Sequence, residues 1–148
     1  MDRAATTLAK LRRALLAVLL FGTVGMFAEL LLLGHIDGVW QWIPVVLLAC
    51  GALAMAWELV RPSSLSLQVL RVLMSLFVVS GVVGLALHYK GNVEFEREMY
   101  PALAGWQLFK QAITGATPAL APGTMSLFGL LGWLYTFRKN NSPVGERS

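Results

Sequence analysis

Two stretches of this chain share one pattern, in which a pair of glycines three residues apart is followed by an ionisable residue: Gly22-x-x-Gly25-x-x-x-Glu29 and Gly81-x-x-Gly84-x-x-x-His88. An ionisable group inside a lipid bilayer is costly unless it meets a partner or a water-filled cavity, so Glu29 and His88 are the first candidates for chemistry. An imidazole titrates near neutral pH, and burial raises a carboxyl group toward the same range. The pair would therefore bind and release a proton or a cation. The plainer alternative is a hydrogen bond that fixes helix register.

The two ionisable residues are predicted to lie at one depth. Glu29 is 16 residues beyond Arg13, and His88 is 17 residues beyond Arg71. At 1.5 Å per residue, each side chain rises about 25 Å above its basic anchor. Small residues on the same helical face let helix backbones approach closely. We therefore expect helix packing at a set of small residues: Gly22, Gly25, Ser80, Gly81 and Gly84.

Other ligand-type side chains are expected near this outer end of the helices. His35 completes a candidate proton or cation site with Glu29 and His88. A supporting acidic patch is predicted from Asp37, Glu94, Glu96 and Glu98. The same three candidates, His35, His88 and Glu29, would suit zinc, copper or iron, although no H-E-x-x-H, H-x-x-x-H or paired-cysteine signature accompanies them. A heme held by the two histidines is a further alternative, but the sequence identifies no cofactor and we expect none.

The composition indicates the elements that position these residues. The 148 residues are 57% hydrophobic and only 14% charged, which does not suit a soluble domain with a polar shell. Four apolar segments are long enough to cross the roughly 30 Å hydrocarbon core of a bilayer: 14–33, 39–60, 67–89 and 119–137. Backbone groups in lipid must be satisfied within the segment, which makes such runs helices. The predicted fold class is all-α, a four-transmembrane-helix bundle in one domain over residues 1–148.

The distribution of Lys and Arg predicts the orientation. Nine of them lie on one side of the predicted spans: Arg3, Lys10, Arg12, Arg13, Arg61, Arg71, Arg138, Lys139 and Arg147. Three lie on the other: Lys90, Arg97 and Lys110. Basic loop residues stay in the cytoplasm, so we expect both termini to be cytoplasmic in a bacterial inner membrane. The net charge of +4 would meet anionic lipid headgroups and requires no nucleic-acid partner.

The connections carry their own signals. The basic start and long first apolar segment predict a retained helix and not a cleaved signal peptide. On the inner side, Glu58 with Arg61 and Arg71 is expected to stabilise the hairpin at Pro62. The third connection, 90–118, is the only sizeable outer segment. Within it a short amphipathic helix is predicted, lying on the membrane surface or over the bundle as a lid, with an apolar face of Ala102, Trp106, Phe109 and Ile113.

Two stretches carry a family resemblance, His88–Glu98 and Pro118-Ala-Leu-Ala-Pro-Gly123. They are similar to sequences of small bacterial four-helix inner-membrane proteins to which no function is assigned, so the resemblance implies location and fold only. The chain also resembles the small multidrug-resistance transporters, which have four helices and an essential glutamate in the first. It departs from them because Glu29 lies near the outer edge of the membrane and because the third connection is long.

These features favour a non-enzymatic membrane component. The single cysteine, Cys50, cannot form the internal dithiols of membrane thiol oxidases, and we expect it to pack between helices. No Ser-His-Asp frame or glycine-rich phosphate loop is present. We expect an accessory subunit of a larger membrane complex or a homo-oligomer in the lipid bilayer. A proton- or cation-coupled transporter and a metal or heme redox protein on the periplasmic face are the alternatives.

Overall fold

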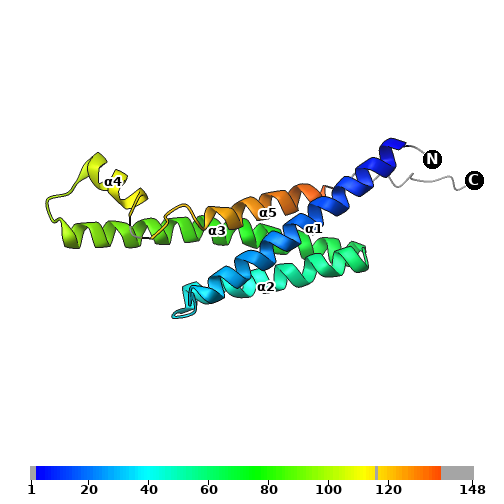
Figure 1. The fold of residues 1–148 in the computed structure, drawn as a ribbon, viewed down its shortest axis with the longest axis horizontal. Helices are drawn as coiled ribbons and strands as arrows, with labels where there is room; N and C mark the ends of the chain where they lie inside the picture. The colour runs from blue at the N-terminus through cyan, green and yellow to red at the C-terminus, as the bar shows by residue number, and fades with distance from the viewer. Residues whose placement is uncertain (1–2, 116, 138–148) are drawn as a thin grey trace, which may run out of the picture.

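The computed structural model describes residues 3–115 and 117–137, and these residues form five helices (Figure 1). The helices are α1 Arg3–Leu32, α2 Val39–Val60, α3 Ser64–Met99, α4 Gly105–Ile113 and α5 Gly123–Thr136. The all-α fold class predicted from the sequence is confirmed.

Three helices, α1, α2 and α3, are long and apolar enough to cross a membrane. They contain 30, 22 and 36 residues, and a crossing takes about 20 helical residues. Large apolar side chains face outward along them, and Phe21, Leu32 and Val60 are each more than three-quarters exposed. A soluble protein rarely exposes apolar surface on this scale. The three helices therefore indicate a membrane protein.

The structure differs from the sequence prediction at the fourth span, 119–137. Helix α5 begins only at Gly123 and has 14 residues, which is about 21 Å long against a hydrocarbon core of about 30 Å. Residues 118–122 form turns instead, in which Gly123 N–H bonds to the Leu120 carbonyl. Pro118 and Pro122 have no N–H to donate, which delays the start of the helix. The structure supports three spans, and the four-span architecture stays a prediction.

Helices α1, α2, α3 and α5 pack around one core. Helix α2 packs against α1 and α3, and α5 packs against the same two helices, so α1 and α3 occupy opposite corners. Figure 1 shows α5 lying along α3 while α1 crosses the bundle obliquely. The core is a cluster of buried apolar side chains: Leu16, Leu19, Leu48, Ala54, Met55, Leu70, Met74, Phe77 and Met125.

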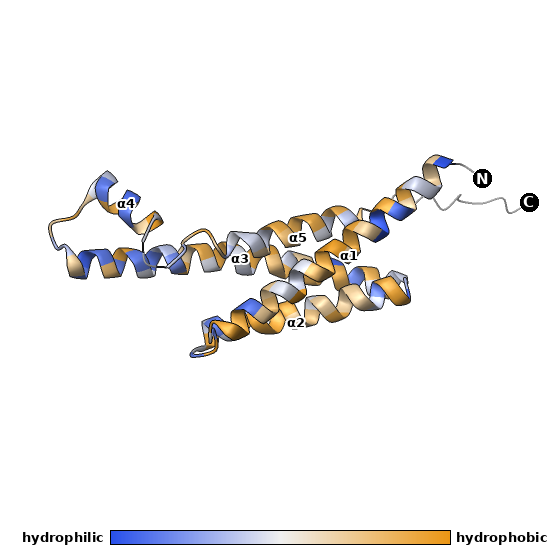
Figure 2. Ribbon diagram, viewed as in Figure 1, coloured by the Kyte–Doolittle hydropathy of each residue, from blue (hydrophilic) through white to orange (hydrophobic). Residues whose placement is uncertain are grey.

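Helix α3 is longer than the predicted span 67–89 because its stop signal comes late. It begins at a capping box, in which the Ser63 and Ser66 side chains each accept a hydrogen bond from the other's backbone N–H, at 3.0 and 2.9 Å. It ends at Met99, because Pro101 disfavours helical backbone at the preceding residue, Tyr100. Its 36 residues extend about 54 Å, and Figure 2 shows that the part beyond the bundle is the more hydrophilic.

Helix α4 folds back on this outer part of α3, as Figure 1 shows. It buries Leu108 and Ala112 and leaves Trp106 70% exposed. Of the predicted apolar face, Trp106 points away from α3, whereas the Phe109 ring lies 6.0 Å from the Tyr89 ring of α3. The rings of Trp106 and Phe109 stack on each other with centres 5.1 Å apart. A position on the membrane surface stays a prediction for α4.

Candidate functional site

The buried carboxyl group of Glu58 is the centre of a polar cluster at the end of the bundle that carries the N-terminus. Glu58 lies near the end of α2 and is 3% exposed. The Tyr135 hydroxyl of α5 donates to its Oε1 at 3.0 Å, and the Ser66 hydroxyl of α3 donates to its Oε2. A buried carboxyl group needs such donors to offset its lost hydration. Glu58 thus ties three helices together, and the expected pairing with Arg61 or Arg71 is not formed.

Two arginines cap the last turn of α5. Arg12 of α1 donates from Nη2 to the Tyr135 carbonyl oxygen, and Arg71 of α3 donates from Nη2 to the Thr136 carbonyl oxygen at 3.0 Å. The Arg12 guanidinium also lies 4.9 Å from the centre of the Tyr135 ring, an attractive cation–π arrangement. The last carbonyls of a helix lack partners inside the helix and carry partial negative charge. These arginines therefore hold α5 in the bundle.

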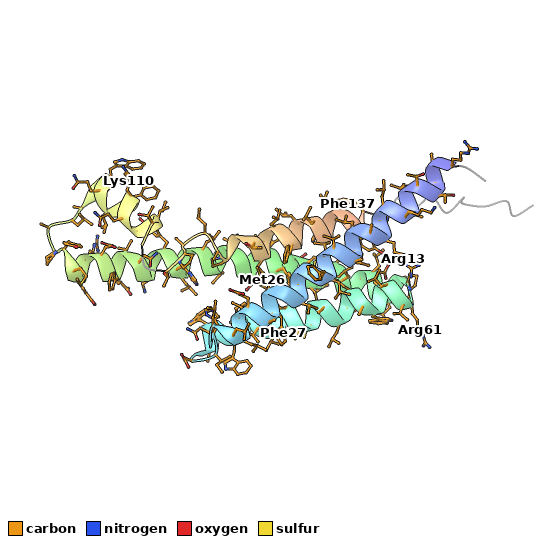
Figure 3. The ribbon with its side chains drawn as sticks, in the orientation of Figure 1. Arg13, Met26, Phe27, Arg61, Lys110 and Phe137 are labelled. Carbon is orange, nitrogen blue, oxygen red and sulfur yellow. The ribbon has the colours of Figure 1, made fainter. Side chains whose placement is uncertain are left out.

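An open groove of about 380 Å³ lies beside this cluster. Leu8 of α1 and Leu59 of α2 contribute to its apolar wall, and Arg12 and Arg13 contribute positive charge. Figure 3 shows Arg13 and Arg61 at the same end of the bundle. The groove combines an apolar wall with guanidinium groups, which suits an amphiphilic ligand.

At the other end of the bundle the structure brings His35 and His88 together. Their ring centres are 6.4 Å apart, and the rings are tilted by 45°. His35 follows Gly34, whose φ of 63° ends α1 in a Schellman motif: His35 N–H bonds to the Leu30 carbonyl at 2.9 Å and Gly34 N–H to the Leu31 carbonyl at 3.1 Å. This turn directs the chain back toward α2 and places the His35 ring beside α3.

Charge and burial act on His35 together. The pKa of His35 is lowered from its ordinary value of 6.5, first because partial burial disfavours the charged ring and then because His88 lies nearby. Asp37 opposes this shift by stabilising the charged form. His88 lies in α3, and its Nδ1 is 3.2 Å from the Pro118 carbonyl oxygen. Burial and the neighbouring His88 together therefore disfavour a proton on His35.

The remaining predicted members of the outer site lie apart. Glu29 is exposed on α1, and its side chain makes no hydrogen bond or ion pair with the described residues. Glu94 pairs with Lys90 at 3.6 Å on the surface of α3. Because this segment is helical, Glu96 points to another side and is buried, while Glu98 is exposed. In the described part of the chain no three His, Cys, Asp or Glu side chains are placed to hold a metal ion.

Most of the predicted packing glycines lie at helix contacts. A Cβ on Gly81 would be 2.8 Å from the Pro122 carbonyl oxygen, and one on Gly84 would be 2.8 Å from the Pro122 side chain. A Cβ on Gly22 would meet the Phe128 ring at 2.7 Å, whereas one on Gly25 would meet nothing within 4 Å. Ser80 beside them is partly buried. Glycines of α3 therefore bring α5 into close contact.

Asn92 fixes the outer segment to α3. Its amide is 2% exposed and donates to the carbonyl oxygens of Ala112 and Thr117, both at 2.8 Å. Its side-chain oxygen accepts from the Thr117 N–H at 3.2 Å. Together with His88, Asn92 and Thr117 line an open cavity of about 320 Å³. One member of the histidine pair, His88, therefore lines a cavity beside the hydrogen-bonded amide of Asn92.

No family model, curated protein or solved structure matches this chain. The site must therefore be assigned from its own residues. Sequence reasoning placed the candidate chemistry at the outer end and missed the role of Glu58 with Tyr135 and Arg12. A signal was present, because Glu58 is an acidic residue within an apolar segment, as Glu29 is. Its partner on α5, Tyr135, is distant in the sequence, and no motif around Tyr135 indicates the contact.

Proposed function

We propose that this chain is a non-enzymatic component of the bacterial inner membrane, a multi-pass protein with both termini in the cytoplasm. It would act as an accessory subunit of a larger membrane assembly or as a homo-oligomer. The orientation rests on the bias of Lys and Arg toward one side. A fluorescent reporter fused to the C-terminus should fluoresce in the cytoplasm. A signal confined to the periplasm would contradict this orientation.

One observation carries the proposal: the interior polar side chains serve to join helices, while the outer faces of α1, α2 and α3 are apolar. Glu58, Asn92 and Arg71 each bond to another element of the same chain. Phe21 is 82% exposed on α1, and Figure 2 shows that the helices of the bundle consist mostly of apolar residues. Surfaces of this kind contact lipid or the helices of another membrane protein.

Site-specific cross-linking in intact membranes tests this proposal. A photoreactive phenylalanine analogue at Phe21 should yield a discrete adduct with another polypeptide, either a second copy or a partner subunit. The same analogue at Phe77 is the matched control, because Phe77 is fully buried in the core and should react only within the chain. Lipid adducts alone at Phe21 and at Val60, another exposed position, would overturn the proposal.

The histidine pair favours a second candidate, proton-coupled transport. The two rings lie 6.4 Å apart, and the pKa of His35 is lowered by burial and by His88. Histidine side chains can bind and release protons, and this proximity makes the pair a candidate proton site. The test is proton flux in reconstituted vesicles that contain a pH-sensitive dye. His88→Gln and His35→Gln should lose flux with folding intact, Glu94→Gln serves as the surface control, and unchanged flux in the first two would refute this candidate.

A further inference from the structure

The groove beside Glu58 has the chemistry of a lipid-binding site. Leu8, Ala9 and Leu59 give it an apolar wall, and Arg12 and Arg13 lie on the same lining. Its volume of about 380 Å³ is open to the outside of the bundle. An acyl chain can pack along an apolar wall of this kind. The phosphate of the lipid headgroup can then accept hydrogen bonds from guanidinium groups at the end of the wall.

Arg12 and Arg13 differ in the contacts that they make within the protein. Arg12 is held in place by the Tyr135 carbonyl and ring, and this contact uses one of the five N–H donors of its guanidinium. Arg13 is exposed and makes no hydrogen bond or ion pair with the residues that the structure describes. Arginine forms paired hydrogen bonds to phosphate oxygens, so both side chains have donors to offer.

Glu58 also lines the groove but does not cancel this charge. Both of its carboxyl oxygens accept hydrogen bonds, one from Tyr135 and one from Ser66. Even counted as a full negative charge, Glu58 leaves the lining positive because Arg12 and Arg13 oppose it. The carboxyl group would disfavour a second negative group close to it, and the phosphate is expected on the Arg13 side.

We propose that this groove binds one anionic phospholipid, with the phosphate on Arg12 and Arg13 and an acyl chain along Leu8 and Leu59. The inference rests on the proposed function only through the position of the chain in a membrane. The lipid would fill the space between α1 and the end of α2, next to the cluster that holds α5. Basic cavities between membrane helices bind anionic headgroups by this chemistry.

Native mass spectrometry of the full chain, released from nanodiscs of mixed phosphatidylglycerol and phosphatidylcholine, tests the proposal. One phosphatidylglycerol should remain bound to the wild type. Arg13→Gln should weaken its binding roughly fivefold, whereas Arg61→Gln, the same change at an exposed arginine outside the groove, should not. Equal losses in both variants would indicate general surface attraction and overturn the proposal.

A second pair of variants tests whether lipid binding requires the space in the groove as well as its positive charge. Ala9→Phe fills the groove without changing charge, and Ala17→Phe places the same side chain on an exposed position of α1 outside it. Only Ala9→Phe should lose the bound lipid. Retention in Ala9→Phe, or displacement by millimolar inorganic phosphate, would overturn lipid binding in this groove. If cross-linking at Phe21 still succeeds, the proposed function survives that failure.

Discussion

A single methyl group at Gly81 tests how α3 and α5 are held together. A Cβ there would clash with Ser126 Oγ and would lie 2.7 Å from the Ser126 backbone nitrogen and 2.8 Å from the Pro122 carbonyl oxygen. Two of these atoms belong to the backbone of α5 and its entry turn, so they cannot move without shifting the helix. We therefore predict that Gly81→Ala forces α5 away from α3. Overpacking of this kind costs about 1–3 kcal/mol.

Gly25→Ala is the matched control. Gly25 is the second glycine of the matching α1 pattern, and a Cβ there meets nothing within 4 Å. Replacing glycine by alanine inside a helix gains about 1 kcal/mol of helix propensity. This gain is common to both variants, so the difference between them isolates the steric cost. Gly81→Ala should be less stable than Gly25→Ala by about 1–3 kcal/mol.

The assay is reversible unfolding in mixed micelles, followed by far-ultraviolet circular dichroism and tryptophan fluorescence. Trp133 of α5 donates from its indole N–H to Ser75 Oγ of α3 at 2.7 Å, so its emission reports on this interface. A separation of α5 from α3 should change the fluorescence of Gly81→Ala before unfolding. Equal stability of the two variants, with unchanged emission, would refute the close approach of α3 and α5.

Three further outcomes follow from the polar contacts. The lowered pKa of His35 means that its contribution to the unfolding free energy is complete above pH 6.5 and is lost as the pH falls through the folded-state pKa. NMR titration should show this pKa rising in His88→Gln, and an unchanged value would exclude the coupling. Arg71→Gln should lower stability by about 1–2 kcal/mol, since a charged hydrogen-bond donor leaves the end of α5; Arg61→Gln should have little effect in the same unfolding assay. Asn92→Leu should free α4 from α3, and faster hydrogen exchange in α4 with an unchanged bundle would demonstrate this; unchanged exchange would contradict the anchoring role.

Hydrophobic runs predict that helices form better than they predict where the helices end. The predicted span 39–60 coincides with α2, Val39–Val60, because Asp37 and Gly38 precede it and Arg61 and Pro62 follow it. Helix α1 starts earlier than residue 14, at Arg3, since basic side chains do not interrupt a helix. Helix α3 continues to Met99 for the same reason. Helix α5 is shorter than the predicted span 119–137. The prolines near its start leave the segment apolar, but they interrupt a helix.

Counting residues predicts a depth along each helix, but it does not predict which helices are neighbours. Counting residues placed Glu29 and His88 at one level, yet α1 and α3 lie at opposite corners of the bundle. The side chain that reaches His88 comes from the connection after α1, through the turn at Gly34. Spacing within a segment determines which residues share a face, whereas helix arrangement depends on packing among all segments. Close contacts such as Gly129 of α5 with the Met74 carbonyl of α3, where a Cβ would be 2.6 Å away, had no signal in either segment alone.

The end of α5 gives a structural role to two of the basic residues. An α-helix leaves its last four carbonyls without partners inside the helix. Each of the four has a partner here: Thr136 Oγ1 donates to the Trp133 carbonyl, Phe137 N–H to Leu134, Arg12 to Tyr135 and Arg71 to Thr136. Two of the nine basic residues that predict the orientation therefore also complete the fold. Charge bias and helix capping require positive groups at the same end, so a substitution at Arg12 or Arg71 should affect both topology and stability.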